Sequence, residues 1–435
     1  MTTTAELLLA RADDERPGLA TRDRTWTWAE HVAEATARAA ALRTLLDEER
    51  PPHVGVLLDN TSEMAMALSA AALGGHVVVG LNTTRRGESL LADIRTGDCQ
   101  VVLTDAARVE LLEGLDLGGV RVIRVDAPEW TDLSSGDPGV TFPELGDESL
   151  FMLIFTSGTS GEPKAVRVTH ERVWFPGVAL ADMFSITRDD VLYVSMPLFH
   201  SNAVMSGYAL ALVTGATLAL AEKFSASGFL GDVRHFGATY MNYVGKPLSH
   251  ILATPEREDD ADNPLRIAFG NEANEKDIAA FSSRFGCEVR DGFGSTENAV
   301  IISRVEGTPP GSLGKPLDGV KVLDRETGEE CPPARIGPDG RVTNLDECVG
   351  ELVNVDGAGQ FAGYYNDDAA TAERMRDGMY WSGDLAYRDS DGWVYFAGRT
   401  AAWLRVDGEN LACAPIERVL LRHPAIDQAA VYAVP

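Results

Sequence analysis

The sequence predicts an α/β protein, with a large N-terminal domain made of two doubly wound αβ subdomains and a small β-barrel. Short apolar strand patterns alternate with helix patterns through most of the chain. Strands that alternate with helices form parallel sheets that helices cover. At 435 residues the chain also exceeds the length at which one hydrophobic core stops growing, so several packed units are expected.

The first subdomain, about residues 1–150, shows this alternation clearly. Its expected elements are a helix over 26–46, a strand over 53–59, an alanine-rich helix over 62–75, and strands over 76–82 and 99–105. The segment 127–146 is rich in Pro, Gly, Asp and Ser, and is expected to run over the surface.

The second subdomain, about residues 151–304, repeats the pattern. Its expected elements include a strand over 150–155, a helix near 173–183, a strand over 191–200, a helix through Leu212 and a strand over 217–222. Short strands broken by Gly, Pro and Asp over 305–400 predict the small β-barrel. The remaining residues, 401–435, are interpreted as a hinge and the incomplete start of a further αβ domain.

The composition excludes several classes of function. A formal charge of −28 argues against nucleic acid and against anionic membrane surfaces as partners. No apolar run reaches the length of a membrane span, and the N-terminus has no basic region of a signal peptide. The 5 scattered cysteines form no metal-binding or disulfide pattern. These features predict a cytoplasmic protein with reduced thiols.

The stretch from Thr156 to Lys164, "TSGTSGEPK", is a candidate phosphate-binding loop. Small residues let several backbone N–H groups converge on one anion, while hydroxyls add donors and a lysine adds charge. The spacing differs from that of a Walker A loop, so the stretch alone also fits an ordinary surface turn.

Four further motifs follow this loop in order, and together they sharpen the interpretation. They are "MPLFHSN" at 196–202, "GFGSTEN" at 292–298, "YWSGDLA" at 380–386 and "GRTAAWLRVDGENLA" at 398–412. With the loop, these motifs make the chain resemble the adenylate-forming superfamily of acyl-CoA synthetases, non-ribosomal adenylation domains and luciferases, over essentially its whole length. The segments 80–88, 243–252, 269–273 and 404–417 look most like long and very-long-chain acyl-CoA synthetases of the fatty-acid-transport-protein type.

The resemblance implies an ATP site with Mg²⁺ and with coenzyme A as co-substrate. Residues expected to hold the nucleotide are Thr156, Ser157, Gly158, Thr159, Lys164, Gly270, Asn271, Glu272, Phe293, Gly294, Thr296, Asp384 and Arg399. Catalytic roles fall to Lys164, His200, Thr296 and Glu297, with Glu297 as the Mg²⁺ ligand. Phe293 stands where relatives usually have a tyrosine stacked on adenine, and Asp384 would bind the ribose hydroxyls.

Each of these residues also has a purely structural interpretation. Phe293 fits a core aromatic, Glu297 a charge at a helix N-terminus, and Asp384 a turn residue. His200 at a strand end fits a hydrogen-bonded structural histidine equally well.

The sequence narrows the chemical class of the acid that would be activated. An amino-acid substrate needs a buried anion opposite its ammonium group, and the stretch 199–215 contains no Asp or Glu. The substrate pocket, by resemblance, comprises His200, Asn202, Met205, Tyr243 and Val244, with Val204 and Tyr240 beside them. A fatty or alicyclic acid is therefore expected.

Two positions depart from the family pattern. Ala402 stands where relatives usually have a hinge aspartate, and the chain ends at Pro435, before the position of the C-terminal lysine of relatives. We interpret this end as a truncation within the C-terminal domain, with an enzyme whose partner supplies the rest as the alternative.

The sequence thus predicts an AMP-forming acyl-CoA synthetase, with a homodimer as one possible assembly. Two alternatives stay open: an adenylating enzyme that passes the acyl group to a carrier protein, an amine or another nucleophile, and an ATP-binding fragment or pseudoenzyme with little turnover.

Overall fold

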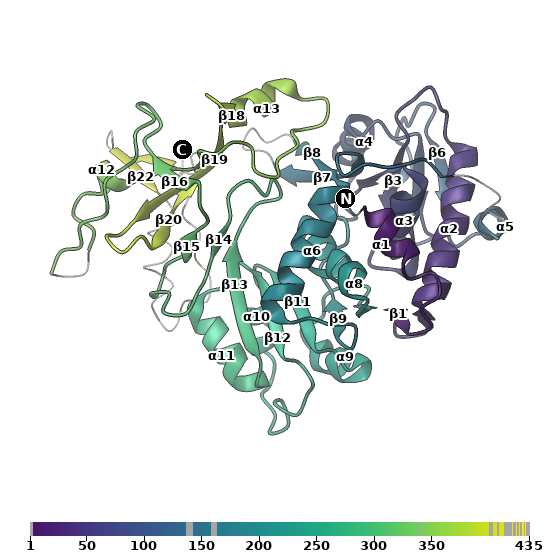
Figure 1. The fold of residues 1–435 in the computed structure, drawn as a ribbon, viewed down its shortest axis with the longest axis horizontal. Coiled ribbons are helices and arrows are strands. Elements are labelled where there is room, and N and C mark those ends of the chain that lie inside the picture. Colours follow the sequence, from purple (N-terminus) through teal and green to yellow (C-terminus); the bar gives the residue numbers. More distant parts are fainter. Residues whose placement is uncertain are drawn as a thin grey trace. The chain divides into compact units, whose positions relative to one another are not determined.

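The computed structural model of the chain describes residues 3–135, 142–157, 163–338, 341–399, 403–406 and 409–412, together with residues 420, 423, 426, 429 and 431. It divides into two compact units (Figure 1). Unit 1 comprises Met1–Arg290 and Ala362–Asn366, and unit 2 comprises Asp291–Phe361 and Asp367–Pro435. Two of the predicted site residues, Gly158 and Thr159, lie outside the described residues, as does Ala402.

The first sheet of unit 1 has six strands in the order β6, β5, β3, β4, β7, β8. Their bounds are β3 His53–Leu57, β4 Val77–Gly80, β5 Val101–Thr104, β6 Arg121–Arg124, β7 Leu150–Ser157 and β8 Pro163–Thr169. All neighbours are parallel except β7 and β8, which pair antiparallel. The buried residues of β3, β4 and β5 are mostly Val and Leu, as expected for strands covered on both faces.

The second sheet of unit 1 runs in the order β13, β12, β11, β9, β10, β1, β2. Its strands are β1 Pro17–Ala20, β2 Thr25–Thr27, β9 Val191–Val194, β10 Thr217–Leu220, β11 Tyr240–Val244, β12 Ile267–Asn271 and β13 Glu288–Phe293, which continues into unit 2. The strands from β12 to β1 are parallel. Their carboxyl ends therefore meet at one edge, which is where ligands bind in sheets of this kind.

Helices connect the parallel strands of unit 1. They are α1 Thr4–Leu9, α2 Trp28–Leu45, α3 Ser62–Gly74, α4 Gly87–Thr96, η1 Val109–Leu112, α5 Pro128–Ser134, α6 His170–Phe184, α7 Ser201–Ala203, the π-helical turn η2 Val204–Tyr208, α8 Ala209–Thr214, α9 Phe229–Phe236, α10 Pro247–Leu252 and α11 Glu275–Phe285. Local sequence explains several starts: α2 opens with a capping box between Thr27 and Glu30, and Thr169 caps α6 through the Arg172 backbone N–H.

The main hydrophobic core of unit 1 joins both sheets to the helices α2, α3, α6 and α8. Side chains of β3 and β7 from the first sheet share it with side chains of β9, β10 and β11 from the second. A separate aromatic cluster fills the space between the other face of β9, β11 and β12 and the helices α9, α10 and α11. Side chains on the two faces of β11 therefore pack in different clusters, one in the main core and the other in the aromatic cluster.

Unit 2 is built mainly on an antiparallel sheet. Its elements are β14 Ile302–Ser303, β15 Lys315–Pro316, β16 Val320–Leu323, α12 Leu345–Cys348, β17 Gly350–Asn354, α13 Asp368–Arg374, β18 Met375–Arg376, β19 Met379–Arg388, β20 Val394–Arg399, β21 Trp403–Val406 and β22 Glu409–Ala412. Strand β19 pairs with β17, β18 and β20, while β21 and β22 form a separate pair. A small β-barrel was expected here, and the strand pairs between described residues form an open sheet instead.

The α/β class predicted from the sequence is confirmed, and one surface segment differs from expectation. The predicted surface stretch 127–146 contains the helix α5, which has Pro128 at its first turn. Its Trp130 is 2% exposed and donates from Nε1 to Glu63 Oε2 at 3.1 Å. Burial of one large aromatic side chain, with its hydrogen bond to α3, therefore stabilises a helix over Pro128–Ser134, where the composition suggested a loop.

Candidate active site

The predicted phosphate loop is held at both ends by the β7–β8 pair. Thr156 lies directly opposite Lys164 in the register, and Ser157 lies opposite Pro163. The Lys164 side chain is 8% exposed, and its ammonium group lies 5.2 Å from the centroid of the Tyr364 ring. Antiparallel pairing thus brings the first and last residues of the loop together and places a buried cation beside its base.

The segment 362–366 returns to unit 1 to cover this cation. Val166 forms a β-bridge with Tyr364, and the backbone N–H of Tyr365 donates to Ala165 O at 2.8 Å. The backbone N–H of Arg167 donates to Gly363 O at 3.1 Å. The short segment therefore extends the sheet beyond β8 and supplies the aromatic face that meets the Lys164 ammonium.

His200 lies just beyond the carboxyl end of β9 and precedes α7. Its backbone N–H donates to Pro197 O at 3.0 Å, and its ring lies 4.7 Å from the ring of Phe199. Burial lowers the pKa of the imidazole, which favours the neutral form at pH 7. Asn60 fixes the preceding turn, because its side chain donates to Met196 O at 2.7 Å and accepts from the Leu198 N–H at 2.8 Å.

Three asparagine side chains converge where α7 meets β11 and β12. Asn242 Nδ2 donates to Asn202 Oδ1 at 2.6 Å, and Asn202 Nδ2 lies 3.4 Å from Tyr243 O and 3.5 Å from Asn271 Oδ1. Of these residues, Asn202 and Asn271 were predicted from the sequence, and Asn242 was not. Its only sequence signal is a polar residue in the otherwise apolar strand "YMNYV".

The structure separates the predicted pocket residues between two faces of β11. The Tyr243 ring is fully buried in the aromatic cluster beneath α9, α10 and α11, and its hydroxyl donates to Arg290 O at 3.5 Å. Asn242 and Val244 alternate to the face that meets α7, and Val244 is 37% exposed. Met205 is buried in η2. Side-chain alternation therefore takes Tyr243 away from Asn202, although its carbonyl stays beside it.

The carboxyl end of β12 carries the predicted adenine-binding residues. A Cβ atom on Gly270 would lie 2.2 Å from Tyr243 O, so only glycine allows β11 and β12 to approach here. The backbone N–H of Gly245 donates to Asn271 O at 2.9 Å, and Glu272 adopts a left-handed backbone with φ of 68°. These contacts fix the two strand ends beside each other.

In unit 2, Asp384 lies in a buried, charged environment on β19. Its side chain is 6% exposed, and Arg399 Nε on the paired strand β20 donates to Asp384 Oδ1 at 3.0 Å. Burial raises the pKa of Asp384 and the negative charge of Glu297 raises it further, while Arg399 and Arg374 oppose both effects. Glu297 and Asp384 therefore belong to one electrostatic cluster.

The turn before Asp384 depends on a residue that the motifs did not indicate. Glu351 is 2% exposed and accepts from the Gly383 N–H at 2.6 Å. Its other oxygen forms ion pairs with Arg325 and Arg376, at 2.9 and 3.4 Å. A buried carboxylate thus holds the loop that presents Asp384, and no feature of "VGELVNVDG" distinguishes it from an ordinary strand residue.

Phe293, Gly294, Thr296 and Glu297 follow one another from the end of β13 into the next loop. The Phe293 ring lies 6.0 Å from the Phe396 ring, and Glu297 is 9% exposed. The next residue, Asn298, has φ of 53° and donates to Gln360 Oε1 at 2.7 Å, which fixes the loop. The loop is therefore fixed directly beside the buried Glu297.

The protein residues suit a metal ion that receives most of its ligands from substrate phosphates and water. Within the described residues, no group of three or more His, Cys, Asp or Glu side chains could hold a metal ion. Mg²⁺ is commonly bound by one or two carboxylates together with substrate phosphates and water. Glu297 fits that mode, whereas a site made entirely of protein ligands does not.

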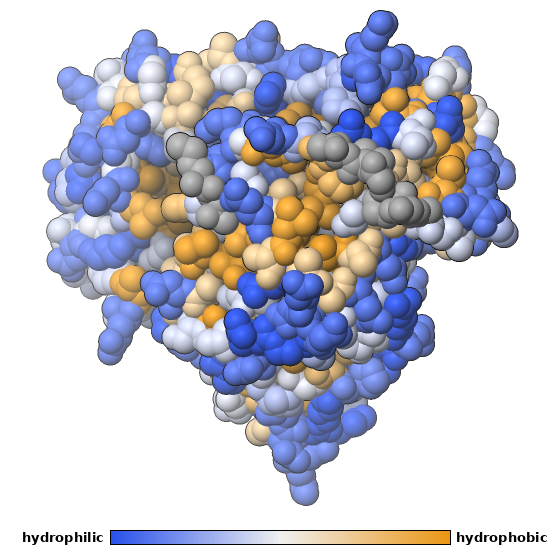
Figure 2. Space-filling view, turned by 45° about the vertical axis from the view of Figure 1, so that its right-hand side comes forward, coloured by the Kyte–Doolittle hydropathy of each residue, from blue (hydrophilic) through white to orange (hydrophobic). Residues whose placement is uncertain are grey.

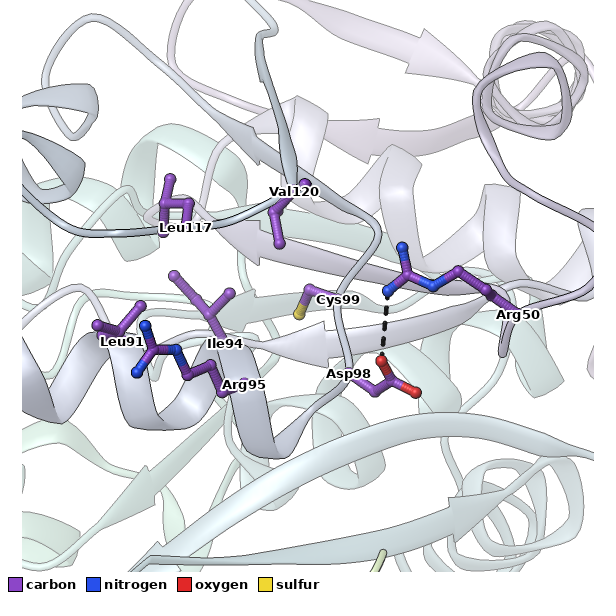
Figure 3. Close-up of a pocket in the computed structure, with 9 residues that line it drawn as sticks. Arg50, Leu91, Ile94, Arg95, Asp98, Cys99, Leu117 and Val120 are labelled. Carbon is purple, nitrogen blue, oxygen red and sulfur yellow. Dashed lines mark hydrogen bonds and ion pairs between the residues drawn. The ribbon is translucent and has the colours of Figure 1, made fainter.

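A surface pocket lies at the opposite edge of the first sheet (Figure 3). It is lined by Arg50, Leu91, Ile94, Arg95, Asp98, Cys99, Leu117, Gly119 and Val120. Arg50, Cys99 and Val120 lie one to three residues before the parallel strands β3, β5 and β6, so the pocket lies at the amino ends of these strands. It contains none of the predicted site residues.

Hydrophobic residues also reach the surface of the molecule, among hydrophilic ones (Figure 2). On α6, Phe175, Val178 and Met183 are 49%, 44% and 59% exposed. Among the helices that the structure describes, none combines the length and the apolar character of a membrane-spanning segment.

Comparison with known proteins establishes the family. Residues 9–365 match the family of AMP-binding enzymes, and the chain belongs to that family. A medium/long-chain fatty acid–CoA ligase of Mycobacterium marinum is 52% identical over the whole of this chain, which spans 83% of that protein. A steroid-22-oyl-CoA synthetase of Rhodococcus jostii is 46% identical over the whole of this chain and 79% of its own length.

The expected likeness to synthetases of the fatty-acid-transport-protein type is a distant one, and the fold matches that of a solved CoA synthetase. A long-chain fatty acid transport protein of Rattus norvegicus is 30% identical over 98% of this chain and 73% of its own length, well below the two bacterial relatives. The solved O-succinylbenzoate CoA synthetase of Bacillus subtilis, in complex with ATP and magnesium, is 26% identical. Its TM-score is 0.79, over 98% of this chain and 86% of that chain.

Proposed function

We propose that the protein is an AMP-forming acyl-CoA synthetase for medium- to long-chain fatty or alicyclic acids. In the first step a carboxylate oxygen of the acid attacks the α-phosphorus of ATP, and the bond to the bridging oxygen breaks to release pyrophosphate. In the second step the thiolate of coenzyme A attacks the acyl carbonyl, and AMP leaves. Family membership and the names of the two bacterial relatives support this reaction.

The observation that carries the proposal is the gathering of polar residues at the carboxyl ends of three neighbouring parallel strands. His200 follows β9, Asn202 meets β11, and Asn271 ends β12. Ligands of parallel α/β sheets bind at this edge. The acid would lie beside His200 and Asn202, with the adenine near Gly270, Asn271 and Glu272.

Lys164 and His200 would act on the reacting groups in different ways. A buried ammonium at the base of the phosphate loop stabilises the charge that develops on the phosphate oxygens, because few waters compete with it. The imidazole of His200 is kept neutral by burial, so it can donate one hydrogen bond to the substrate carboxylate without forming an ion pair. Thr156, Ser157 and Thr296 would add hydroxyl donors to the phosphates.

The unit 2 residues would bind the ribose and the metal. Asp384, oriented by Arg399, would accept hydrogen bonds from the ribose hydroxyls, and the Phe293 ring would stack on adenine. Glu297 would hold Mg²⁺, which neutralises phosphate charge when bound. The chain is placed nearer to the fatty acid–CoA ligases than to the fatty-acid-transport proteins, because of 52% against 30% identity.

Mass spectrometry of the products tests this function. The protein is incubated with ATP, Mg²⁺, coenzyme A and a panel of short, long, aromatic and steroid-like acids. A CoA thioester from the long-chain or alicyclic acids is the expected result. Acyl-AMP without thioester would assign the acyl group to another acceptor, and the absence of any acid-dependent pyrophosphate release would refute the proposal.

A further inference from the structure

Two buried polar atoms on one face of β11 have no hydrogen-bond partner among the described residues. Asn242 and Tyr240 are both 0% exposed, and neither Asn242 Oδ1 nor Tyr240 Oη is paired. Buried polar groups in folded proteins are nearly always satisfied by protein or by ordered water, so two orphans on one strand face require an explanation.

The surrounding network fixes the orientation of the Asn242 amide. Asn242 Nδ2 donates to Asn202 Oδ1, while Asn202 Nδ2 points to the Tyr243 carbonyl and to Asn271 Oδ1. Turning the Asn242 amide over would set its oxygen against Asn202 Oδ1, acceptor to acceptor. The free position of Asn242 is therefore an acceptor, and its partner must be a donor.

The two orphans lie on the face of β11 that carries Val244 and meets Asn202, two residues of the substrate pocket predicted from the sequence. Alternation sends Met241 and Tyr243 to the aromatic cluster beneath α9–α11. Tyr240 instead packs in the main core, where its ring is 6.3 Å from that of Phe184, and Asn242 contacts Asn202 of α7. The amide cluster thus connects Asn271, at the end of β12, through Asn202 to Asn242, whose Oδ1 has no partner among the described residues.

We propose that Asn242 and Tyr240 recognise a hydroxyl group on the acyl chain or ring of the substrate. The hydroxyl donates its proton to Asn242 Oδ1, and the Tyr240 hydroxyl is available to a further oxygen deeper along the same strand face. An apolar pocket with one precisely placed acceptor favours the acid that satisfies it, because a plain alkyl acid leaves the acceptor unpaired. This inference rests on the proposed function, since it takes the acid to lie beside β11.

The test compares matched acids with and without a hydroxyl. Linear C8 to C12 acids hydroxylated at successive carbons, and alicyclic acids with and without a ring hydroxyl, are assayed for thioester formation with MgATP and coenzyme A. At least one hydroxylated acid should exceed its unsubstituted match by about tenfold or more in kcat/KM. Equal or lower values for every hydroxylated acid would overturn the proposal.

Substitutions in β11 test whether Tyr240 and Asn242 cause the preference for a hydroxylated acid. Tyr240→Phe removes a hydroxyl that has no partner among the described residues, and Asn242→Leu removes the acceptor. Each should reduce the ratio of kcat/KM for the hydroxylated acid to kcat/KM for its unsubstituted match, mainly through KM. Met241→Leu on the opposite face of the strand is the matched control and should keep the preference. An undiminished preference in both Tyr240→Phe and Asn242→Leu would contradict the assignment.

A binding measurement separates this inference from the proposed reaction. If no acid yields a thioester or acid-dependent pyrophosphate release, the proposed reaction is refuted, and the thermal shift produced by each acid alone is compared. A larger shift with the hydroxylated acid than with its match, lost in Tyr240→Phe or Asn242→Leu, supports the polar recognition element. Equal shifts for the matched acids would overturn it.

Discussion

At the scale of single residues, Asp93 shows how burial changes acid–base behaviour. Its side chain on α4 is 1% exposed and lies 3.0 Å from Arg85 Nε. Burial raises the pKa of Asp93 from 3.8 to about 6, although Arg85 opposes the shift. The folded protein therefore binds this proton more tightly than the unfolded chain does, and the stability that it contributes is lost as pH rises through about 6.

The corresponding prediction uses Asp93→Asn, which keeps the shape and removes the titration. Relative to this variant, the natural protein should lose about 2 kcal/mol of unfolding free energy between pH 4 and pH 8. Urea unfolding of both proteins across this pH range measures the difference, in which the other titrating groups cancel. A constant difference would show that Asp93 is not buried as an uncharged acid.

Asp384 leads to a prediction about ligand binding. Asp384→Asn removes the charged acceptor that Arg399 orients. A hydrogen bond to a charged group contributes about 1.5–3 kcal/mol. The affinity for AMP and ATP should therefore fall by roughly 10- to 100-fold. Calorimetric titration of AMP measures the change. Asp391→Asn, at an exposed turn of unit 2, is the control and should bind AMP as the natural protein does.

At the scale of elements, helix α6 depends on one glycine where it crosses α8. A Cβ atom on Gly177 would lie 2.8 Å from Ala209 O and 2.9 Å from Ala209 C, and both are backbone atoms that cannot rotate away. Gly177→Ala adds about 1 kcal/mol of helix propensity, but the overpacking costs typically 1–3 kcal/mol, so a net loss is expected.

Thermal and urea unfolding check the sign of this effect. Gly177→Ala should lower the stability of unit 1, whereas Ala179→Ser on the exposed side of α6 should change it by no more than about 0.5 kcal/mol. A stabilised Gly177→Ala protein would mean that α6 and α8 are farther apart than described.

At the scale of the whole molecule, the charge of −28 opposes the approach of an anionic nucleotide. Salt shortens the Debye length from about 30 Å at 0.01 M to about 8 Å at 0.15 M, which screens this long-range repulsion more than the contacts inside the site. The association rate constant of MgATP should therefore rise over this range, as measured by stopped flow with a fluorescent analogue. A falling rate would show that local cations such as Lys164 dominate the approach.

Much of the architecture was predictable because it depends on local pattern. The helices at 28–45 and 62–74 and the strands at 53–57 and 101–104 follow from hydrophobic periodicity and capping residues. Segment 127–146 was harder to interpret, because one buried side chain, Trp130, outweighs a turn-like composition. The order of the motifs could also be recognised, because each motif is contiguous in sequence.

The α/β class, the family membership indicated by ordered short motifs, and the acidic charge of the molecule all follow from the sequence alone. The packed structure was needed to show that Tyr243 turns away from Asn202 and that Glu351 supports the turn before Asp384. It also showed that Asn242 Oδ1 has no partner among the described residues. Alternation along a strand can be read locally, but which face meets which helix depends on contacts between residues far apart, such as Asn202 and Asn242, and these form only when the chain packs.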